Sequence, residues 1–373
     1  MAKNKIMVVV GTRPEIIRLA ETIKKIDQYF DLVLVHTGQN YDHNLNQIFF
    51  EELELKSPNY YLDSPGETLG KTVGNIIAKT YDVMVQERPD ALLILGDTNS
   101  CLSAYSAKRL KIPIFHMEAG NRCFDFNTPE EINRRVVDHL SDINLAYSDN
   151  AKQYLISEGK TKDEVFVTGS PMTEVIRKYT PKIDESDILE KLNLENDKYF
   201  VVSLHREENL DIGDNFKTVC NTLNVVAEKY KIPIIFSTHP RTQKRIRAEA
   251  IQFNPLIINM PAMGFLDYNK LQKNAYCVLS DSGTICEEGT IQHFPAVSVR
   301  MAQERPEGLD AGTLILGGIE KDSMLSAIDI AVGTDYNTDE IMVPNYQDTN
   351  VSDKVLRIIQ SYMPIVNSRT WHK

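Results

Sequence analysis

Three carboxylates and one histidine stand where acid-base chemistry could be built. They are Asp97, Glu118, Glu130 and His205. Asp97 and Glu118 each follow a short apolar run that predicts a buried strand, and parallel strands end at the same edge of a sheet. Two carboxylates at that edge suit proton transfer to and from a bound molecule. Taken singly, they also fit capping of a turn or helix, and Glu130 fits the acidic first turn that any helix favours.

A second pattern indicates an anion site. Cys277–Leu279 predicts a strand, Asp281-Ser-Gly-Thr284 a tight turn, and Ile285–His293 a helix. Backbone N–H groups and the positive end of the helix dipole converge at such a turn, which suits a phosphate. Glu287 and Glu288 lie beside it, and a carboxylate there could bind two ribose hydroxyls. An ordinary capped helix after a core strand explains the same pattern without a ligand.

The chain has a net charge of −11, so an anionic ligand requires basic side chains that are gathered locally. The candidates lie in polar segments, most of which follow predicted strands. They are Arg13, Arg18, Arg122, Arg134, Arg135, His205, Arg206, His239, Arg241 and Arg305. The acidic balance and the lack of a basic block argue against nucleic acid as a partner.

The elements that must position these side chains alternate between strand and helix. Continuous apolar runs such as Ile6–Val10 and Ala91–Leu95 predict parallel strands that are covered on both faces. The alternation through residue 168 predicts a doubly wound, Rossmann-like domain spanning 1–168. It restarts at Tyr199–Leu204, so we expect a second such domain in 169–351, with the ligand in a cleft between the two.

Length and composition agree with two α/β domains. The 373 residues exceed one ordinary core, and contents of 42% apolar and 25% charged residues are typical of a globular protein. No apolar run approaches the roughly 20 residues of a membrane span, and the N-terminus lacks a signal-peptide pattern. Five scattered cysteines fit a reducing compartment. We therefore expect a cytoplasmic protein without a membrane partner.

Several common site motifs are missing from the sequence. It has no G-x-G-x-x-G fingerprint, no G-x-S-x-G elbow and no His/Cys/Asp cluster with metal spacing. The segment Gly66–Thr72 resembles a P-loop only in part, because Pro65 stands where the first glycine is needed. We therefore predict no metal and no cofactor.

Together, these segments resemble the non-hydrolysing UDP-N-acetylglucosamine 2-epimerase family. The matching pieces run in family order over nearly the whole chain: Gly11-Thr-Arg-Pro-Glu15, Gly96-Asp-Thr98, Glu118-Ala-Gly120, Pro129-Glu-Glu-x-Asn-Arg134, His205-Arg-x-Glu208, Asp281-Ser-Gly283 with Glu287-Glu288, and Glu304-Arg-Pro-Glu307. The resemblance implies an α/β fold of two Rossmann-like domains in the glycosyltransferase-B arrangement. It also implies a C-terminal helix, 352–373, that packs back on the first domain, and a homodimer.

Three segments resemble one branch of the family more closely. They are His36-Thr-Gly-Gln-Asn-Tyr-Asp42, Gly96-Asp-Thr-Asn-Ser-Cys-Leu102 and His116-Met-Glu-Ala-Gly-Asn-Arg-Cys-Phe-Asp125. Enzymes of this branch serve capsule and O-antigen synthesis and convert UDP-2-acetamido-2,6-dideoxy-L-talose to UDP-N-acetyl-L-fucosamine. The nearest alternative is a UDP-N-acetylglucosamine 2-epimerase that forms UDP-N-acetylmannosamine. A glycosyltransferase of the same fold and a non-catalytic nucleotide-sugar sensor are further alternatives.

The chemistry that the resemblance implies needs acid, base and cationic groups. The proton on C2 is not next to a carbonyl, so simple removal and return is unfavourable. Elimination of UDP from C1 as C2 loses its proton, followed by re-addition, avoids this problem. The family's catalytic residues correspond to Asp97, Glu118, Glu130 and His205. The predicted substrate-binding residues are Arg13, Arg18, Arg122, Arg134, Arg206, His239, Ser282, Gly283, Thr284, Glu288 and Arg305.

Two positions depart from the family pattern. Arg18 stands where many members have a lysine, which keeps the charge but changes the geometry. Asn40 stands where members that are activated by their own substrate usually have a histidine. The second departure favours a different substrate and predicts activity without UDP-N-acetylglucosamine as an activator.

Overall fold

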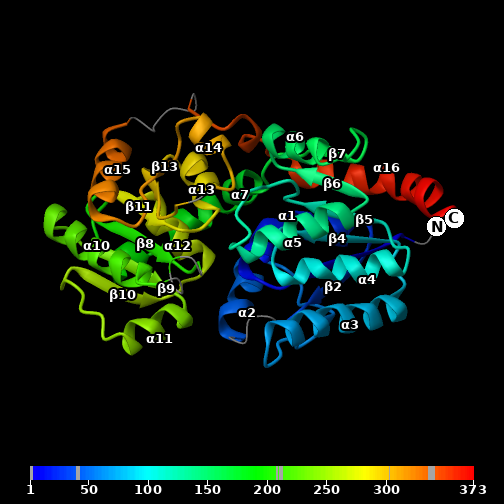
Figure 1. The fold of residues 1–373 in the computed structure, drawn as a ribbon, viewed down its shortest axis with the longest axis horizontal. Helices are drawn as coiled ribbons and strands as arrows, with labels where there is room; N and C mark the ends of the chain where they lie inside the picture. Colours follow the sequence, from blue (N-terminus) through cyan, green and yellow to red (C-terminus); the bar gives the residue numbers. More distant parts are fainter. Residues whose placement is uncertain (1–2, 39–42, 207–208, 210–212, 302, 335–340) are drawn as a thin grey trace. The chain divides into compact units, whose positions relative to one another are not determined.

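The computed structural model describes residues 3–38, 43–206, 209, 213–301, 303–334 and 341–373, so Asn40 and Glu208 lie outside the described residues. The chain forms two compact units, each built around its own sheet (Figure 1). Unit 1 comprises Met1–Arg177 and Pro344–Lys373, and unit 2 comprises Lys178–Val343.

Unit 1 contains a seven-stranded sheet in which every pairing is parallel. Its strands are β1 (Lys5–Val10), β2 (Asp31–His36), β3 (Tyr60–Tyr61), β4 (Ala91–Leu95), β5 (Ile114–Met117), β6 (Ile143–Ala146) and β7 (Val165–Val167). The spatial order is β3-β2-β1-β4-β5-β6-β7. Strand order therefore reverses between β1 and β4, and the loops after these strands leave in opposite directions. That point of a doubly wound sheet is where ligands bind.

The helices of unit 1 form two groups. Its helical elements are α1 (Arg13–Tyr29), α2 (His43–Glu52), α3 (Leu69–Glu87), η1 (Asn99–Leu102), α4 (Ser103–Arg109), α5 (Pro129–Leu140), α6 (Asp149–Ser157), the first part of α7 (Met172–Glu185), η2 (Pro344–Tyr346) and α16 (Val351–Trp371). Helix α1 packs against α2 and α16, whereas α4 packs against α3 and α5. Since crossovers are right-handed, the reversal of strand order puts these two groups on opposite faces of the sheet.

Buried apolar side chains on both faces explain the continuous apolar strands. Met7 and Val9 of β1 pack in one cluster with Met84 of α3, Ala104 of α4 and Val137 of α5. The intervening β1 side chains, which are also fully buried, point to the other face. Burial on both faces is what a parallel sheet requires.

Unit 2 repeats the same topology in a six-stranded parallel sheet. Its strands are β8 (Phe200–Leu204), β9 (Ile234–Thr238), β10 (Ile257–Pro261), β11 (Cys277–Ser280), β12 (Ala296–Ser298) and β13 (Ile315–Leu316). Its helices include α8 (Ile188–Lys191), α10 (Asn215–Tyr230), α11 (Pro240–Ala248), α12 (Phe265–Lys273), α13 (Ile285–Gln292), α14 (Glu307–Asp310) and α15 (Lys321–Gly333). The order β10-β9-β8-β11-β12-β13 reverses between β8 and β11.

The predicted fold class is confirmed as α/β, with two parallel sheets that are each flanked by helices. The predicted connector Arg177–Lys198 corresponds to the end of α7 followed by α8. Within the described ranges, no helix combines the length and apolarity that crossing a membrane requires.

Helix α16 joins the C-terminal end of the chain to unit 1. Its buried side chains recur every three or four residues, as one face of a helix does, and it packs against α1. They include Val351, Val355, Ile359, Met363 and Val366. The rings of Tyr362 and of Phe166 in β7 also pack together, with their centroids 4.8 Å apart, so α16 contacts the sheet as well as α1.

We expect Ile359→Ala to lower the free energy of unfolding by about 2–5 kcal/mol, because Ile359 is fully buried and truncation leaves a cavity. Ile365→Ala, on the same helix but 37% exposed, is the matched control and should change it by about 0.5 kcal/mol or less. Urea unfolding followed by circular dichroism measures both. Equal effects at the two positions would contradict the packing described.

Candidate active site

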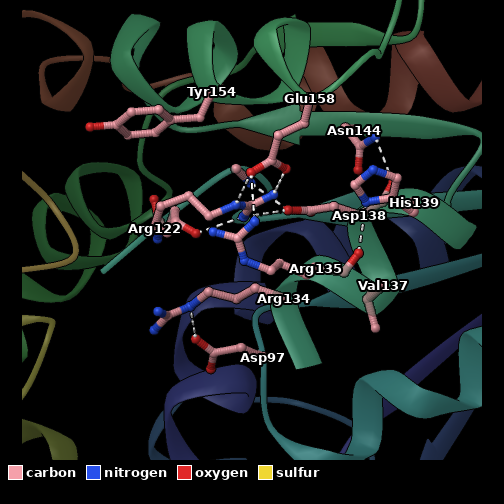
Figure 2. Close-up of polar contacts among 12 residues, drawn as sticks. Asp97, Arg122, Arg134, Arg135, Val137, Asp138, His139, Asn144, Tyr154 and Glu158 are labelled. Carbon is pink, nitrogen blue, oxygen red and sulfur yellow. Dashed lines mark hydrogen bonds and ion pairs between the residues drawn. The ribbon is translucent and has the colours of Figure 1, made fainter. Parts of the chain in front are cut away.

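In unit 1, Asp97 lies two residues after the end of β4, at the point where strand order reverses. Its carboxylate accepts a hydrogen bond of 2.7 Å from Arg134 Nε (Figure 2). In addition, Asn133 Nδ2 donates to its main-chain carbonyl at 2.8 Å. Arg134 and Asn133 both belong to α5. The helix therefore holds Asp97 through its side chain and its main chain.

Glu118 directly follows β5 and is buried, with a left-handed backbone (φ 64°). Arg18 of α1 donates to its carboxylate, and Asn121 Nδ2 lies 3.4 Å from the other oxygen. Gly96 leaves room for this carboxylate, since a Cβ there would come within 3.3 Å of Glu118 Oε2. The structure thus brings together the segments that carry Asp97 and Glu118.

Glu130 and Glu131 are adjacent in α5 but have different surroundings. Glu131 is fully buried and accepts hydrogen bonds from Arg134, from Arg135 and from the main-chain N–H of Cys123. Glu130 is partly exposed. The second carboxylate is therefore committed to the interior of unit 1, and the first reaches solvent.

Arg122 is predicted to bind substrate, but in this structure it serves the interior of unit 1. Its Nε and Nη2 atoms donate to Glu158 at 2.9 and 2.5 Å, and Nη1 donates to Asp138 and to the carbonyl of Asn121, both at 2.7 Å (Figure 2).

Arg13, which is also predicted to bind substrate, begins α1 just after β1. Its guanidinium lies 5.7 Å from the centre of the Phe49 ring.

Glu15 lies beneath the same strand ends, although we did not predict it as a site residue. Its Oε2 accepts from the main-chain N–H groups of Gly11 and Thr12, at 2.9 and 2.7 Å, and from the Thr12 hydroxyl. Ser100 donates to Oε1. Burial raises the pKa of Glu15 to about 7, although hydrogen bonds from Ser100, Thr12 and Gly11 oppose the shift. The sequence signal was its place three residues after the N-cap Thr12, as in a capping box.

In unit 2, His205 follows β8 and pairs with Asp281, which follows β11. His205 Nδ1 lies 3.0 Å from Asp281 Oδ1, and the imidazole is 41% exposed. The fully buried Asp281 also accepts from the main-chain N–H of Arg206 and from Asn209 Nδ2, both at 3.0 Å. Burial acts to raise the pKa of Asp281, but His205 and these hydrogen bonds outweigh it, so the pKa lies below its ordinary value. Asp281 thus fixes the histidine.

The turn Ser282–Thr284 connects β11 to α13, as predicted. The Ser282 and Thr284 hydroxyls lie 2.8 Å apart. A Cβ at Gly283 would lie 2.6 Å from Glu304 Oε1, so any other residue would displace that carboxylate. Glu304 in turn accepts from Arg206 Nη2 at 2.8 Å. The structure therefore brings the turn and the predicted Arg206 together.

The first turn of α13 holds two carboxylates with separate partners. Arg305 is buried and donates to Glu287 and, at 3.2 Å, to the carbonyl of Gly283. Glu288 accepts a hydrogen bond of 2.8 Å from Gln272 of α12. These contacts connect Arg305 to the turn and Glu288 to α12.

His239 is the N-cap of α11 and follows β9, the strand next to β8. Its Nδ1 accepts from the main-chain N–H of Arg241 at 3.3 Å. Among the described side chains, no group of three or more His, Cys, Asp or Glu is arranged to hold a metal ion.

A family model described as UDP-N-acetylglucosamine 2-epimerase matches residues 23–360. The chain belongs to this family. The prediction of a UDP-sugar 2-epimerase family, whose members are isomerases, is thereby confirmed at that level.

Individual members and their structures agree with the family match. The solved UDP-N-acetylglucosamine 2-epimerase of Rickettsia bellii is 46% identical with a TM-score of 0.92, and all of both chains is covered. That of Methanocaldococcus jannaschii, in complex with UDP-GlcNAc and UDP, is 34% identical with a TM-score of 0.90, covering 96% of this chain and 99% of that one. The UDP-2,3-diacetamido-2,3-dideoxy-D-glucuronate 2-epimerase of Pseudomonas aeruginosa is 31% identical over 334 residues, covering 88% of this chain and 92% of that protein.

The buried carboxyl group of Glu15 makes a contribution to stability that depends on pH and can be tested. Because its pKa is about 7 in the folded protein and 4.5 ordinarily, the folded state binds a proton that the unfolded chain releases between these values. Its contribution is therefore full below pH 4.5 and falls by about 3 kcal/mol as the pH rises through 7.

Glu15→Gln resembles the protonated side chain, since its amide can donate to Ser100 while its oxygen keeps the Gly11 and Thr12 contacts. The difference in unfolding free energy between the variant and the wild type should therefore increase in favour of the variant from about pH 5 to about pH 8. Chemical denaturation at several pH values measures this difference. Parallel pH curves for the two proteins would rule out the raised pKa.

Proposed function

We propose that the protein is a UDP-sugar 2-epimerase that acts by elimination and re-addition of UDP. The observation that carries the proposal is the family match together with acid, base and cationic residues at the strand ends of both sheets. In the first step the C2–H bond and the C1–O bond break, a carboxylate takes the proton, and UDP leaves with the electron pair. The product is a glycal with a C1=C2 double bond. UDP then adds back to C1 while C2 receives a proton on its other face.

Unit 1 supplies the carboxylates in this proposal. Asp97, Glu118 and Glu130 come from three consecutive parts of the strand-end edge, after β4, after β5 and at the start of α5. Asp97 and Glu118 are each held by an arginine, and Glu130 reaches solvent. A fixed carboxylate and an accessible one on the same edge suit an elimination that needs a base and an acid on different faces of the sugar.

Unit 2 supplies most of the groups that bind UDP in this proposal, and Arg13 of unit 1 is added to them. Ser282, Gly283 and Thr284 form the turn at the N-terminus of α13, where N–H groups and the helix dipole favour a diphosphate. His205 and Arg13 add positive or hydrogen-bonding groups for the departing phosphates, and Glu288 takes the ribose. Arg305 supports this site indirectly, because it binds the Gly283 carbonyl of the turn and the Glu287 carboxylate.

For the sugar, we propose conversion of UDP-2-acetamido-2,6-dideoxy-L-talose to UDP-N-acetyl-L-fucosamine, for a bacterial surface polysaccharide. The segments His36–Asp42, Gly96–Leu102 and His116–Asp125 support this choice by their resemblance to that branch. Family membership leaves the hexose open, because a relative 31% identical bears the name of a diacetamido-glucuronate 2-epimerase. The second candidate is UDP-N-acetylglucosamine, since relatives of 46% and 34% identity bear the name of that epimerase.

We also propose a homodimer, as in the family that the sequence resembles. Large apolar side chains stand 40–50% exposed on three helices of unit 1 that pack side by side. They are Tyr81 and Val85 of α3, Tyr105 of α4, and Ile132 and Val136 of α5. A second copy would bury these side chains.

Incubation in D₂O separates the candidate substrates. We expect proton NMR to show deuterium entering C2, together with the epimer, when the purified protein receives UDP-2-acetamido-2,6-dideoxy-L-talose. Exchange from UDP-N-acetylglucosamine would favour the second candidate. Exchange from neither sugar would leave a glycosyltransferase or a nucleotide-sugar sensor as the better function.

Variants of the three carboxylates test the division of labour. Asp97→Asn, Glu118→Gln and Glu130→Gln should each lower kcat by about 10²–10⁴-fold, because each removes a proton-transfer group. The dissociation constant of UDP, measured by calorimetry, should change less than about threefold, since the proposed UDP groups lie mainly in unit 2.

Asp149→Asn is the matched control for these variants, because Asp149 is also a first-turn carboxylate of a helix that follows a strand, here β6. It should leave kcat unchanged. Full activity in all three carboxylate variants would eliminate the proposed mechanism.

A further inference from the structure

Asp138 of α5 is a fully buried carboxylate that the proposed mechanism does not use. Its Oδ1 lies 2.9 Å from His116 Nδ1. Its Oδ2 accepts from Arg122 Nη1 at 2.7 Å and from the main-chain N–H of Gly120 at 3.2 Å (Figure 2). One carboxylate therefore binds three residues of a single stretch of unit 1, residues 116–122.

His116 extends this contact to a second segment. It is fully buried in β5, and its Nε2 lies 2.8 Å from the main-chain carbonyl of Gly96. A carbonyl can only accept, so Nε2 carries a hydrogen and donates it. Asp138, His116 and Gly96 thus form a chain of hydrogen bonds from α5 to the turn after β4.

The two glycines in this hydrogen-bond network lie beside groups that the proposed reaction requires. Gly96 immediately precedes Asp97, and Gly120 is two residues beyond Glu118. The same helix carries Arg134, which binds the Asp97 carboxylate at 2.7 Å. Asp97 is therefore held from α5 on both sides, through its side chain by Arg134 and through the preceding carbonyl by His116.

The backbone of the two segments needs such support. Gly96 and Gly120 have φ angles of 72° and 88°, and Glu118, which has a side chain, has 64°. A left-handed backbone costs a residue with a Cβ about 1–2 kcal/mol, and it persists only where surrounding contacts impose it. The hydrogen bonds of Asp138 and His116 flank all three positions.

Stability alone does not account for a cluster of this kind. A buried ion pair contributes little net stability, because desolvation of the charges offsets their attraction, and apolar residues of the same volume often serve as well. Burial acts to raise the pKa of Asp138, but His116 and Arg122 outweigh it and hold the pKa below its ordinary value. Asp138 is therefore a charged group that the fold retains inside unit 1.

We infer that Asp138 and His116 are positioning residues that set the placement of Asp97 and Glu118 for proton transfer at C2. The inference rests on the proposed epimerase function for its kinetic consequence. Its structural content, that α5 controls two strand-end segments through one carboxylate and one imidazole, is independent of that function.

The matched pair Asp138→Asn and Asp142→Asn tests this inference. Asp142 is a buried carboxylate two residues beyond the end of the same helix. It binds Lys108 at 2.6 Å and the main-chain N–H of Ile114 at 2.9 Å, at the opposite end of β5. Asp138→Asn should lower kcat by about 100-fold, as small misplacements of reacting groups do, and change KM by less than about threefold. Asp142→Asn should leave kcat unchanged.

Two substitutions of His116 provide a second test, which also applies if Asp138→Asn fails to fold. In His116→Gln the amide can still donate from the Nε2 position to the Gly96 carbonyl, whereas His116→Asn can donate only from the Nδ1 position to Asp138. We expect the glutamine variant to retain about tenfold more kcat than the asparagine variant. Equal loss in both would overturn the assignment of His116.

Amide hydrogen exchange gives a readout that does not depend on activity. In Asp138→Asn, peptides that cover 96–102 and 118–123 should exchange faster than in the wild type, and in Asp142→Asn they should not. If the wild type epimerises neither sugar, the proposed function fails while this measurement still tests the positioning. Unchanged exchange in both segments, with wild-type kcat in Asp138→Asn, would overturn the inference.

Discussion

The reversal of strand order in the middle of each sheet is the constraint on which the candidate site depends. In each unit, two neighbouring strands are followed by loops that leave the sheet in opposite directions. These strands are β1 and β4 in unit 1, and β8 and β11 in unit 2. In a doubly wound sheet this divergence opens a crevice at the strand ends. Side chains at those strand ends, such as Asp97 and His205, can therefore contact a ligand while their strands stay buried in the core. The chemistry needs polar groups, and the topology supplies the one edge where polar groups do not disrupt packing.

Both units use a buried carboxylate to fix these exposed edges. Asp281 in unit 2 binds the main-chain N–H groups of His205 and Arg206, and Asp138 in unit 1 binds that of Gly120. Each also pairs with a histidine, His205 in one case and His116 in the other. The two histidines differ in exposure, since His205 is 41% exposed and His116 is buried. The same interaction therefore holds the exposed His205 where it can contact a ligand in unit 2. In unit 1 it holds the buried His116 against the main-chain carbonyl of Gly96.

The strands and their alternation with helices were readable from the sequence, whereas the partners of the charged residues were not. Runs such as Ile6–Val10 are continuous and β-branched because both faces of the sheet are covered, so the pattern and the fold have one cause. By contrast, Glu131, Arg135 and Asp138 recur at helical spacing in α5, a pattern typical of a solvated face. Two of these three are buried, because the charges pair with one another and with Arg122. Sequence spacing fixes which residues share a face, but it does not reveal that a charged face has partners from other segments.

This limit also explains why the hexose is harder to infer than the reaction. The strand-end groups proposed here recognise the diphosphate, the ribose and the C2–H bond, and every UDP-N-acetylhexosamine has these parts. The same strand-end pattern can therefore serve enzymes whose sugars differ, as the names of the relatives at 31% and 46% identity illustrate. A 6-deoxy-L-sugar differs from N-acetylglucosamine in ring configuration and at C6, where a methyl group replaces the hydroxymethyl group. Discrimination there requires an apolar contact or a hydroxyl left unpaired, which is a matter of local shape rather than of shared acid-base chemistry.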